Sequence, residues 1–306
     1  MKKPVVALAL VSVAALTLAG CSTPATGEGD DGTVQVVAST NVYGSIAAQI
    51  GGDRVEVTSI IESATQDPHS YEVTARDRLS VQEAGLVIEN GGGYDPFVEE
   101  LLDGSDAAVL TAAEISPDFP GSEGQEDAEQ GAEFNEHVWF DPRTMIDVVG
   151  EIAAQLTELD PEGKADFTAA ADEIIADLEG FETDLDAIKT DAGGASVFIT
   201  EPLPGYLAAA AGLTDVTPEG FAESVEEGTD VAPAVLLDAL NVIGSGEVTA
   251  LLTNAQTGGA ETDRVEAAAK DAGIPVVAFT ELLEDGSSYS EWMSDAITSL
   301  AAAVQS

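Results

Sequence analysis

The chain has 306 residues, of which 57 are Asp or Glu and only 10 are Lys or Arg, so its formal net charge is −47. This charge excludes nucleic acid as an expected partner, because phosphate contacts require Lys and Arg. It also disfavours peripheral binding to anionic lipid head groups. The length exceeds one typical domain and suits two lobes.

The N-terminal residues have the composition of an export signal. Two lysines precede an almost wholly apolar run over residues 4–19, which is short for a spanning helix and ends in small residues. The sequence Leu-Ala-Gly-Cys at 18–21 resembles a bacterial lipobox. We therefore expect residues 1–20 to be removed as a lipoprotein signal peptide, with an uncleaved anchor as the alternative. Cys21, the only cysteine, would be lipidated and begin a flexible tether over 21–33, so a hydrophobic core must hold the fold.

Strands and helices alternate through the first half of the chain. Apolar strands are expected at residues 34–38, 55–61, 86–89 and 107–110, with helices ending near Gly51, over 74–84 and around 97–102. This alternation predicts a parallel sheet covered on both faces. The pattern breaks over residues 117–135, which are rich in Pro, Gly, Ser, Glu and Asp and are interpreted as a mobile acidic loop.

A long helix is the clearest single element. Asp160 suits its N-cap and Pro161 its first position, and an apolar stripe repeats every three or four residues from Phe167 to Ile188. Roughly 30 residues at 1.5 Å each span about 45 Å, which is longer than one lobe. We expect this helix to join two lobes, with an ordinary core helix or a coiled coil as the alternative.

Strand–helix alternation resumes after the long helix. Strands are expected at residues 196–200, 214–216, 248–253 and 275–279, and helices over 265–271 and 289–304. The sequence thus predicts an α/β protein of two lobes, each a mostly parallel sheet flanked by helices. Its parts would be an N-terminal lobe over 34–158, a linking helix over 159–192 and a C-terminal lobe over 193–306.

Two short motifs contain the only histidines of the chain, Asp-Pro-His-Ser-Tyr at 67–71 and His-Val-Trp-Phe-Asp-Pro at 137–142. Histidine is the commonest metal ligand, and open α/β sheets bind ligands beyond the carboxyl ends of their strands. Four candidate ligands lie at or near such places: His69, His137, Glu201 and Glu281. Any one of these four residues by itself is more readily explained as a structural residue. The equivalent placement of two candidate ligands in each half of the chain favours a divalent metal site.

These motifs, the first extended to Glu72, resemble those of the metal-specific solute-binding lipoproteins of ABC importers, the zinc- and manganese-binding group. The resemblance runs from about Val34 to the C-terminal helix. It implies two α/β lobes joined by one rigid helix, with a metal ion held at the lobe interface. It also implies an extracytoplasmic monomer, anchored through Cys21 to the outer face of the cell membrane, which delivers its ion to an ABC permease and its ATPase.

The same resemblance implies a ligand set. The first two family ligands correspond to His69 and His137. The third corresponds to Glu201, where relatives have His or Glu, and the fourth to Glu281, where relatives often have the shorter Asp. Direct contact of Glu281 with the ion is therefore less firmly implied.

The ligand set bears on which ion is bound. Three imidazoles in a tetrahedral site favour zinc, whereas two imidazoles with carboxylates suit manganese or iron. Zinc-binding relatives often carry a His-rich loop before the second ligand, and here that loop is acidic. Ligand hardness favours Mn²⁺, while the Irving–Williams order predicts tighter binding of Zn²⁺. The expected cargo is one divalent transition metal ion, Mn²⁺ or Zn²⁺.

Two other classes of protein use similar residues. A metal-dependent enzyme could employ the same two-His/carboxylate site, but the chain has no HExxH motif and no third histidine for a general base, so we expect a binding protein. A surface adhesin or structural lipoprotein would use the metal only for stability and would unfold on losing it. Tyr71 and Trp139 are expected to exclude water from the site, with simple packing as the alternative.

Overall fold

The computed structural model describes residues 33–63, 66–121, 134–284 and 286–305. The predicted signal peptide, Cys21 and most of the tether lie outside these residues, as does the stretch 122–133 of the predicted acidic loop. Residues 33–306 group into one compact unit. Within the described residues, no helix has both the length and the apolar character that a membrane crossing requires.

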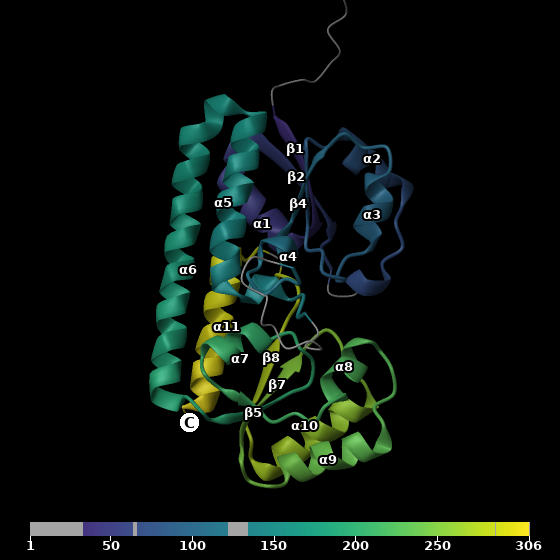
Figure 1. The fold of residues 1–306 in the computed structure, drawn as a ribbon, viewed down its shortest axis with the longest axis vertical. Coiled ribbons are helices and arrows are strands. Elements are labelled where there is room, and N and C mark those ends of the chain that lie inside the picture. The colour runs from purple at the N-terminus through teal and green to yellow at the C-terminus, as the bar shows by residue number, and fades with distance from the viewer. Residues whose placement is uncertain (1–32, 64–65, 122–133, 285, 306) are drawn as a thin grey trace, which may run out of the picture. The chain divides into compact units, whose positions relative to one another are not determined.

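Four parallel strands form the first sheet (Figure 1). Their spatial order is β2-β1-β3-β4. Their bounds are β1 Val34–Thr40, β2 Val55–Ile61, β3 Leu86–Glu89 and β4 Ala108–Thr111. Successive side chains of a strand point to opposite faces. In β1, accordingly, Val36 and Ala38 join the core on one face and Val37 joins a separate core on the other.

Helices cover both faces of this sheet, as predicted. On one face lie α1 (Asn41–Gly51) and α5 (Pro142–Leu159), and on the other α2 (Ala75–Glu83) and α3 (Phe97–Leu102) (Figure 1). Four short helices also occur among the described residues of this half: Gly52–Arg54, Pro68–Ser70, α4 (Ala112–Ile115) and Val138–Phe140. A capping box formed by Thr74 and Asp77 begins α2, which satisfies backbone N–H groups that a helix start leaves unpaired.

A second parallel sheet has the order β6-β5-β7-β8. Its strands are β5 Ser196–Ile199, β6 Thr214–Asp215, β7 Val248–Asn254 and β8 Val276–Phe279. Its helices are α7 Gly205–Ala210, α8 Phe221–Glu226, α9 Pro233–Ile243, α10 Ala260–Ala272 and α11 Tyr289–Val304. Apolar side chains of α8, α9 and α10 pack on one face, and α11 contacts β7 and β8.

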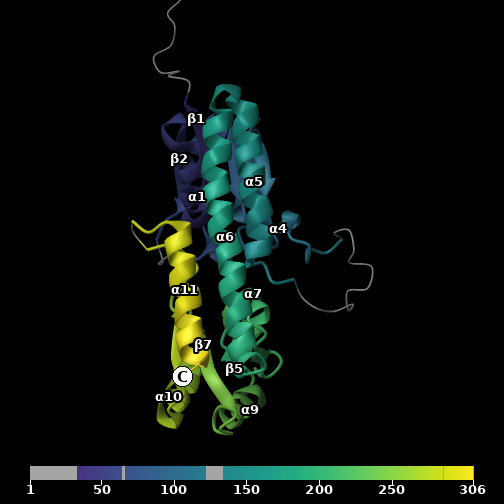
Figure 2. The ribbon, with the colours of Figure 1, turned by 90° about the vertical axis from the view of Figure 1, so that its left-hand side faces the viewer.

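The predicted long helix is confirmed as α6, Lys164–Ala192, with 29 residues. It begins after a short 3₁₀ helix, Pro161–Gly163, whose N-cap is Asp160. The apolar stripe from Phe167 to Ile188 is buried, and α6 contacts α1 and α5 from the first half and α7 and α11 from the second (Figure 2). The two sheets and this helix confirm the predicted fold class. The proposed lobe boundaries stay predictions.

One hydrophobic core extends along α6 and includes residues of both sheets. A single cluster of buried residues includes Val36 of β1, Leu178 of α6 and Leu252 of β7. Polar contacts join the same regions, since the Asn41 side chain hydrogen-bonds both the backbone N–H (3.1 Å) and the backbone C=O (3.0 Å) of Leu283. The two halves are therefore held by more than the linking helix.

Candidate metal site

His69 lies on the short helix Pro68–Ser70, which follows β2. Asp67 caps this helix, because its Oδ1 accepts the His69 backbone N–H at 2.9 Å and its Oδ2 accepts the Ser70 hydroxyl at 2.7 Å. The His69 side chain keeps 33% of its surface exposed. The helix therefore holds an imidazole that solvent can reach at the carboxyl end of the sheet.

His137 is buried, with 2% of its surface exposed. Its Nδ1 is 2.7 Å from Asn135 Oδ1, which also accepts the His137 backbone N–H at 3.1 Å. Asn135 Nδ2 donates to the carbonyl of Pro202 at 3.0 Å, which fixes the amide orientation and makes Oδ1 the acceptor. The proton then lies on Nδ1, and Nε2 is left with a lone pair for a metal ion. Burial, and secondarily the charge of His69, lowers the pKa of His137 to about 3, so the ring is neutral at physiological pH.

Glu201 and Glu281 meet at the carboxyl edge of the second sheet. Glu201 follows β5 and Glu281 follows β8, and β7 lies between these strands and ends at Asn254. Asn254 Nδ2 donates to Glu201 Oε2 at 2.9 Å and to Glu281 Oε1 at 2.7 Å. The carboxylates are only 3% and 6% exposed, and neither has a Lys or Arg partner among the described residues. Thr257 donates a further hydrogen bond to Glu201 Oε1.

Burial raises the pKa of Glu201, and the nearby charge of Glu281 adds to that shift, whereas the hydrogen bonds from Thr257 and Asn254 and the charge of His69 oppose it. Two buried carboxylates thus share one neutral amide, which is an unfavourable place for a pair of negative charges. A bound cation would relieve this cost directly.

Tyr94 connects the imidazoles to the carboxylates. Its buried hydroxyl donates to Glu281 Oε2 at 3.0 Å, and its ring centroid lies 5.2 Å from that of His69 and 6.0 Å from that of His137. The preceding Gly91–Gly93 run has positive φ at all three positions. The Asp95 carboxylate fixes the start of this turn by accepting the backbone N–H groups of Asn90 and Gly91, each at 2.7 Å. The glycine run, which lacks the GxGxxG spacing of a dinucleotide-binding loop, thus places Tyr94 in the site.

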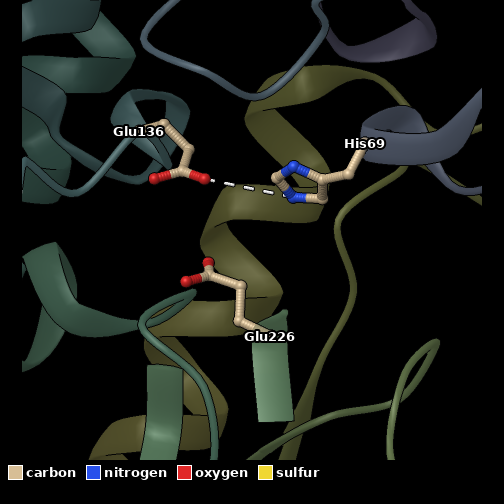
Figure 3. A group of neighbouring side chains, drawn as sticks. All are labelled: His69, Glu136 and Glu226. Atoms are coloured by element: carbon tan, nitrogen blue, oxygen red, sulfur yellow. Dashed lines mark ion pairs between the residues drawn. The ribbon is translucent and has the colours of Figure 1, made fainter. Parts of the chain in front are cut away.

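All four predicted ligands therefore gather in one region, two from each half of the chain. A tighter group of potential ligand atoms, within 4.8 Å of one another, consists of His69, Glu136 and Glu226 (Figure 3). It contains only one of the four residues predicted from the sequence.

Comparisons with known proteins identify the family of the chain. Residues 36–303 match the family model described as "Zinc-uptake complex component A periplasmic", ZnuA. The chain belongs to this family. The manganese-binding lipoprotein MntA of Halalkalibacterium halodurans is 30% identical over 175 residues, 56% of this chain and 56% of MntA. The zinc-binding lipoprotein AdcA of Streptococcus pneumoniae is 28% identical over 235 residues, 74% of this chain and 46% of AdcA.

The matched region thus spans about half the length of each of these relatives. Among solved structures, the periplasmic zinc-binding protein TroA of Treponema pallidum superposes with a TM-score of 0.75 at 17% identity, covering 90% of this chain and all of TroA. This likeness shows that the chain has the fold of TroA.

Several site residues of this ZnuA-family chain were not predicted from its sequence. Asn254 directly follows the predicted strand 248–253, so the rule that identified Glu201 could also have found it. Glu136 stands next to His137, but in a chain with 57 acidic residues adjacency is a weak signal. Nothing in the sequence pointed to Glu226, because no helix was predicted over 221–226.

The two aromatic residues expected at the site have different surroundings. The Trp139 ring lies 5.1 Å from that of His137 and 4.6 Å from that of Tyr94, and only 1% of its surface is exposed, so it excludes water from the buried imidazole. Tyr71 instead packs on Phe97 at 4.9 Å and donates to Asp77 at 3.0 Å. Its contacts are those of simple packing, the alternative given above.

Proposed function

We propose that this chain captures one divalent transition metal ion between its two sheets and delivers it to an ABC permease and its ATPase. The ligands would be His69, His137, Glu201 and Glu281. The observation that carries the proposal is the pair of buried carboxylates that share Asn254 without a cationic partner, across Tyr94 from two imidazoles.

The chemistry of these groups suits reversible capture. His137 needs no deprotonation before binding, because its pKa already lies well below physiological pH. Glu201 and Glu281 supply two negative charges, which offset the cost of burying a divalent cation. Asn254 and Tyr94 donate hydrogen bonds to these carboxylates without an ion, so both carboxylates keep hydrogen-bond partners after the ion leaves.

Two imidazoles with two carboxylates suit Mn²⁺ by ligand hardness, and MntA is named for manganese binding. Zn²⁺ is the alternative cargo, since the Irving–Williams order favours it and AdcA is named for zinc binding. The site offers no unassigned histidine as a general base, which favours transport over catalysis. We further propose that the chain acts as a monomer outside the cytoplasm, anchored by lipid at Cys21.

The test is thermal unfolding of the chelator-stripped full chain during titration with Mn²⁺ or Zn²⁺. The proposal expects a melting temperature that rises and saturates at one ion per chain, because ligand binding stabilises the folded state by mass action. Glu201→Gln should greatly reduce this rise. Glu89→Gln is the matched control, since Glu89 lies at the carboxyl end of β3 and, like Glu201, accepts a threonine hydroxyl, here from Thr111 at 2.7 Å.

A wild-type chain without a metal-dependent shift would refute the proposal, as would equal shifts in the two variants. Chelator then separates transport from a structural or adhesin role. A transport protein stays folded after losing its ion, whereas a structural site unfolds.

A further inference from the structure

His69, Glu136 and Glu226 converge beside the site proposed above (Figure 3). His69 Nε2 is 3.9 Å from Glu136 Oε1, and each of the three side chains offers a ligand atom within 4.8 Å of the others. Ligands at about 2.1 Å from a tetrahedral ion are about 3.4 Å apart. Small side-chain rotations would therefore bring the three into coordination.

The group draws on both halves of the chain. His69 lies between β2 and α2 and Glu136 between α4 and α5, whereas Glu226 is the last residue of α8. Glu226 Oε1 is also 3.5 Å from His137 Nε2. Glu226 therefore lies between the exposed imidazole and the buried one, and it connects the outer group to the inner ligands.

A groove of about 870 Å³ contains the three residues. Its lining also includes Asp67, Asp215, Glu223 and Glu227. Among the described residues, no Lys or Arg lines this groove. The side chains of His69, Glu136 and Glu226 are 33%, 14% and 18% exposed, so they are partly desolvated but reachable from solvent. A groove lined by carboxylates concentrates cations, and the imidazole adds a preference for a transition metal over Ca²⁺ or Mg²⁺.

We propose that His69, Glu136 and Glu226 form an outer position that receives the divalent transition metal ion before it moves to the inner ligands. This inference rests on the function proposed above. One imidazole nitrogen binds one ion at a time, so the two positions alternate through His69 and do not fill together. With three protein ligands and room for water, the outer position binds more weakly than the inner one, as transfer inward requires.

The first test isolates the outer position by weakening the inner one. In the full chain carrying Glu201→Gln, Mn²⁺ binding is followed by the electron paramagnetic resonance signal of the free ion. Weak binding of one ion should remain, and adding Glu226→Gln should reduce its affinity roughly tenfold or more, as loss of a metal-site partner does. Glu227→Gln removes the same charge from the same groove outside the ligand group, and it should change the affinity by no more than about twofold.

The second test follows metal entry in the otherwise unchanged chain by stopped-flow fluorescence, because Trp139 lies against His137. Glu226→Gln should slow both association and release roughly tenfold, within the range of such electrostatic effects, while the equilibrium affinity changes far less. Glu136→Gln should act in the same direction. Glu227→Gln should leave both rates near those of the wild type.

The outcomes separate the two proposals. If the wild type binds Mn²⁺ tightly and Glu226→Gln behaves like Glu227→Gln, only the outer position is refuted. If Glu226→Gln weakens equilibrium binding as much as Glu201→Gln does, Glu226 is an inner ligand and the outer position is wrong. A wild type that binds neither Mn²⁺ nor Zn²⁺ refutes the proposed function itself.

Discussion

Replacing Asn254 by leucine tests whether one amide compensates two buried carboxylates. Leucine has a similar size but no polar atoms, so the change removes the donor to Glu201 and Glu281 as well as the acceptor for the Gln256 N–H at 2.9 Å. Hydrogen bonds to charged groups are worth about 1.5–3 kcal/mol each. The two lost bonds therefore imply that the free energy of unfolding of the metal-free chain falls by about 3–6 kcal/mol.

The free energy of unfolding that Asn254→Leu is expected to lose should depend on pH and on bound metal. The pKa of Glu201 is raised in the folded chain, so as pH falls the folded state takes up a proton more readily than the unfolded state. A protonated Glu201 needs less compensation, so the penalty of Asn254→Leu should shrink as pH falls through this raised pKa. Mn²⁺ held by the proposed ligands would neutralise both carboxylates, and it should therefore stabilise the variant more than it stabilises the wild type.

Urea unfolding of the full chain, followed by far-ultraviolet circular dichroism with and without chelator, measures these differences. Thr253→Val is the matched control, because Thr253 precedes Asn254 in β7, is 4% exposed and makes one long hydrogen bond of 3.5 Å to the Val277 carbonyl. This control should lose less than about 1 kcal/mol. If Asn254→Leu loses no more than Thr253→Val, the carboxylates do not depend on Asn254 and the electrostatic account of the site is wrong.

Two further substitutions probe the surroundings of the site. Asn135→Ala removes the acceptor that orients His137, and calorimetric titration should show metal affinity reduced about 10- to 100-fold. Unchanged affinity would mean that packing alone orients the ring. Asn41→Ala removes two hydrogen bonds to the backbone of Leu283 and should lower the free energy of unfolding in urea by about 1–3 kcal/mol. Asn241→Ala, an exposed change on α9, is the control for both and should stay within about 0.5 kcal/mol.

The sequence predicted the strands closely because each is a short apolar run between turn residues. The expected strands at 55–61 and 86–89 coincide with β2 and β3, and the other expected strands differ by one or two residues at their ends. The expected helices at 97–102 and 289–304 coincide with α3 and α11, whereas the helix expected over 265–271 covers only the later part of α10. The apolar stripe of α6 was equally readable, since its period persists from Phe167 to Ile188, about six turns. These features depend on local pattern alone.

Helices without a long apolar stripe escaped prediction. α7 is mostly alanine and glycine, and α8 has only six residues, too few for a helical period to be recognised. α9 has a proline at its first position and a usable pattern, so it could have been found. The omission of α8 matters most, because this helix carries Glu226.

The sequence could place candidate residues near one another where topology fixes their position. Parallel strands deliver their following residues to one edge, so Glu201 and Glu281 could be expected to meet. The sequence could not rank these acids against the others, nor show that Asn254 bridges them and that Glu226 reaches His137. Such contacts depend on loop conformation and long-range packing. Whether the four predicted residues bind the ion stays a prediction.

The contacts between the two halves bear on how an ion is released. Besides the continuous core, the Tyr289 hydroxyl donates to the Trp139 carbonyl at 2.8 Å. Asn41 holds Leu283, which lies two residues beyond Glu281, so this contact restrains the loop that carries a proposed ligand. A wide separation of the two halves would break all of these contacts together, whereas release of Asn41 alone would free only the Glu281 loop. Asn41→Ala should therefore accelerate metal release to chelator by a larger factor than its loss of unfolding free energy alone would produce. If Asn41→Ala releases the ion no faster than Asn241→Ala does, the Glu281 loop does not control metal exchange.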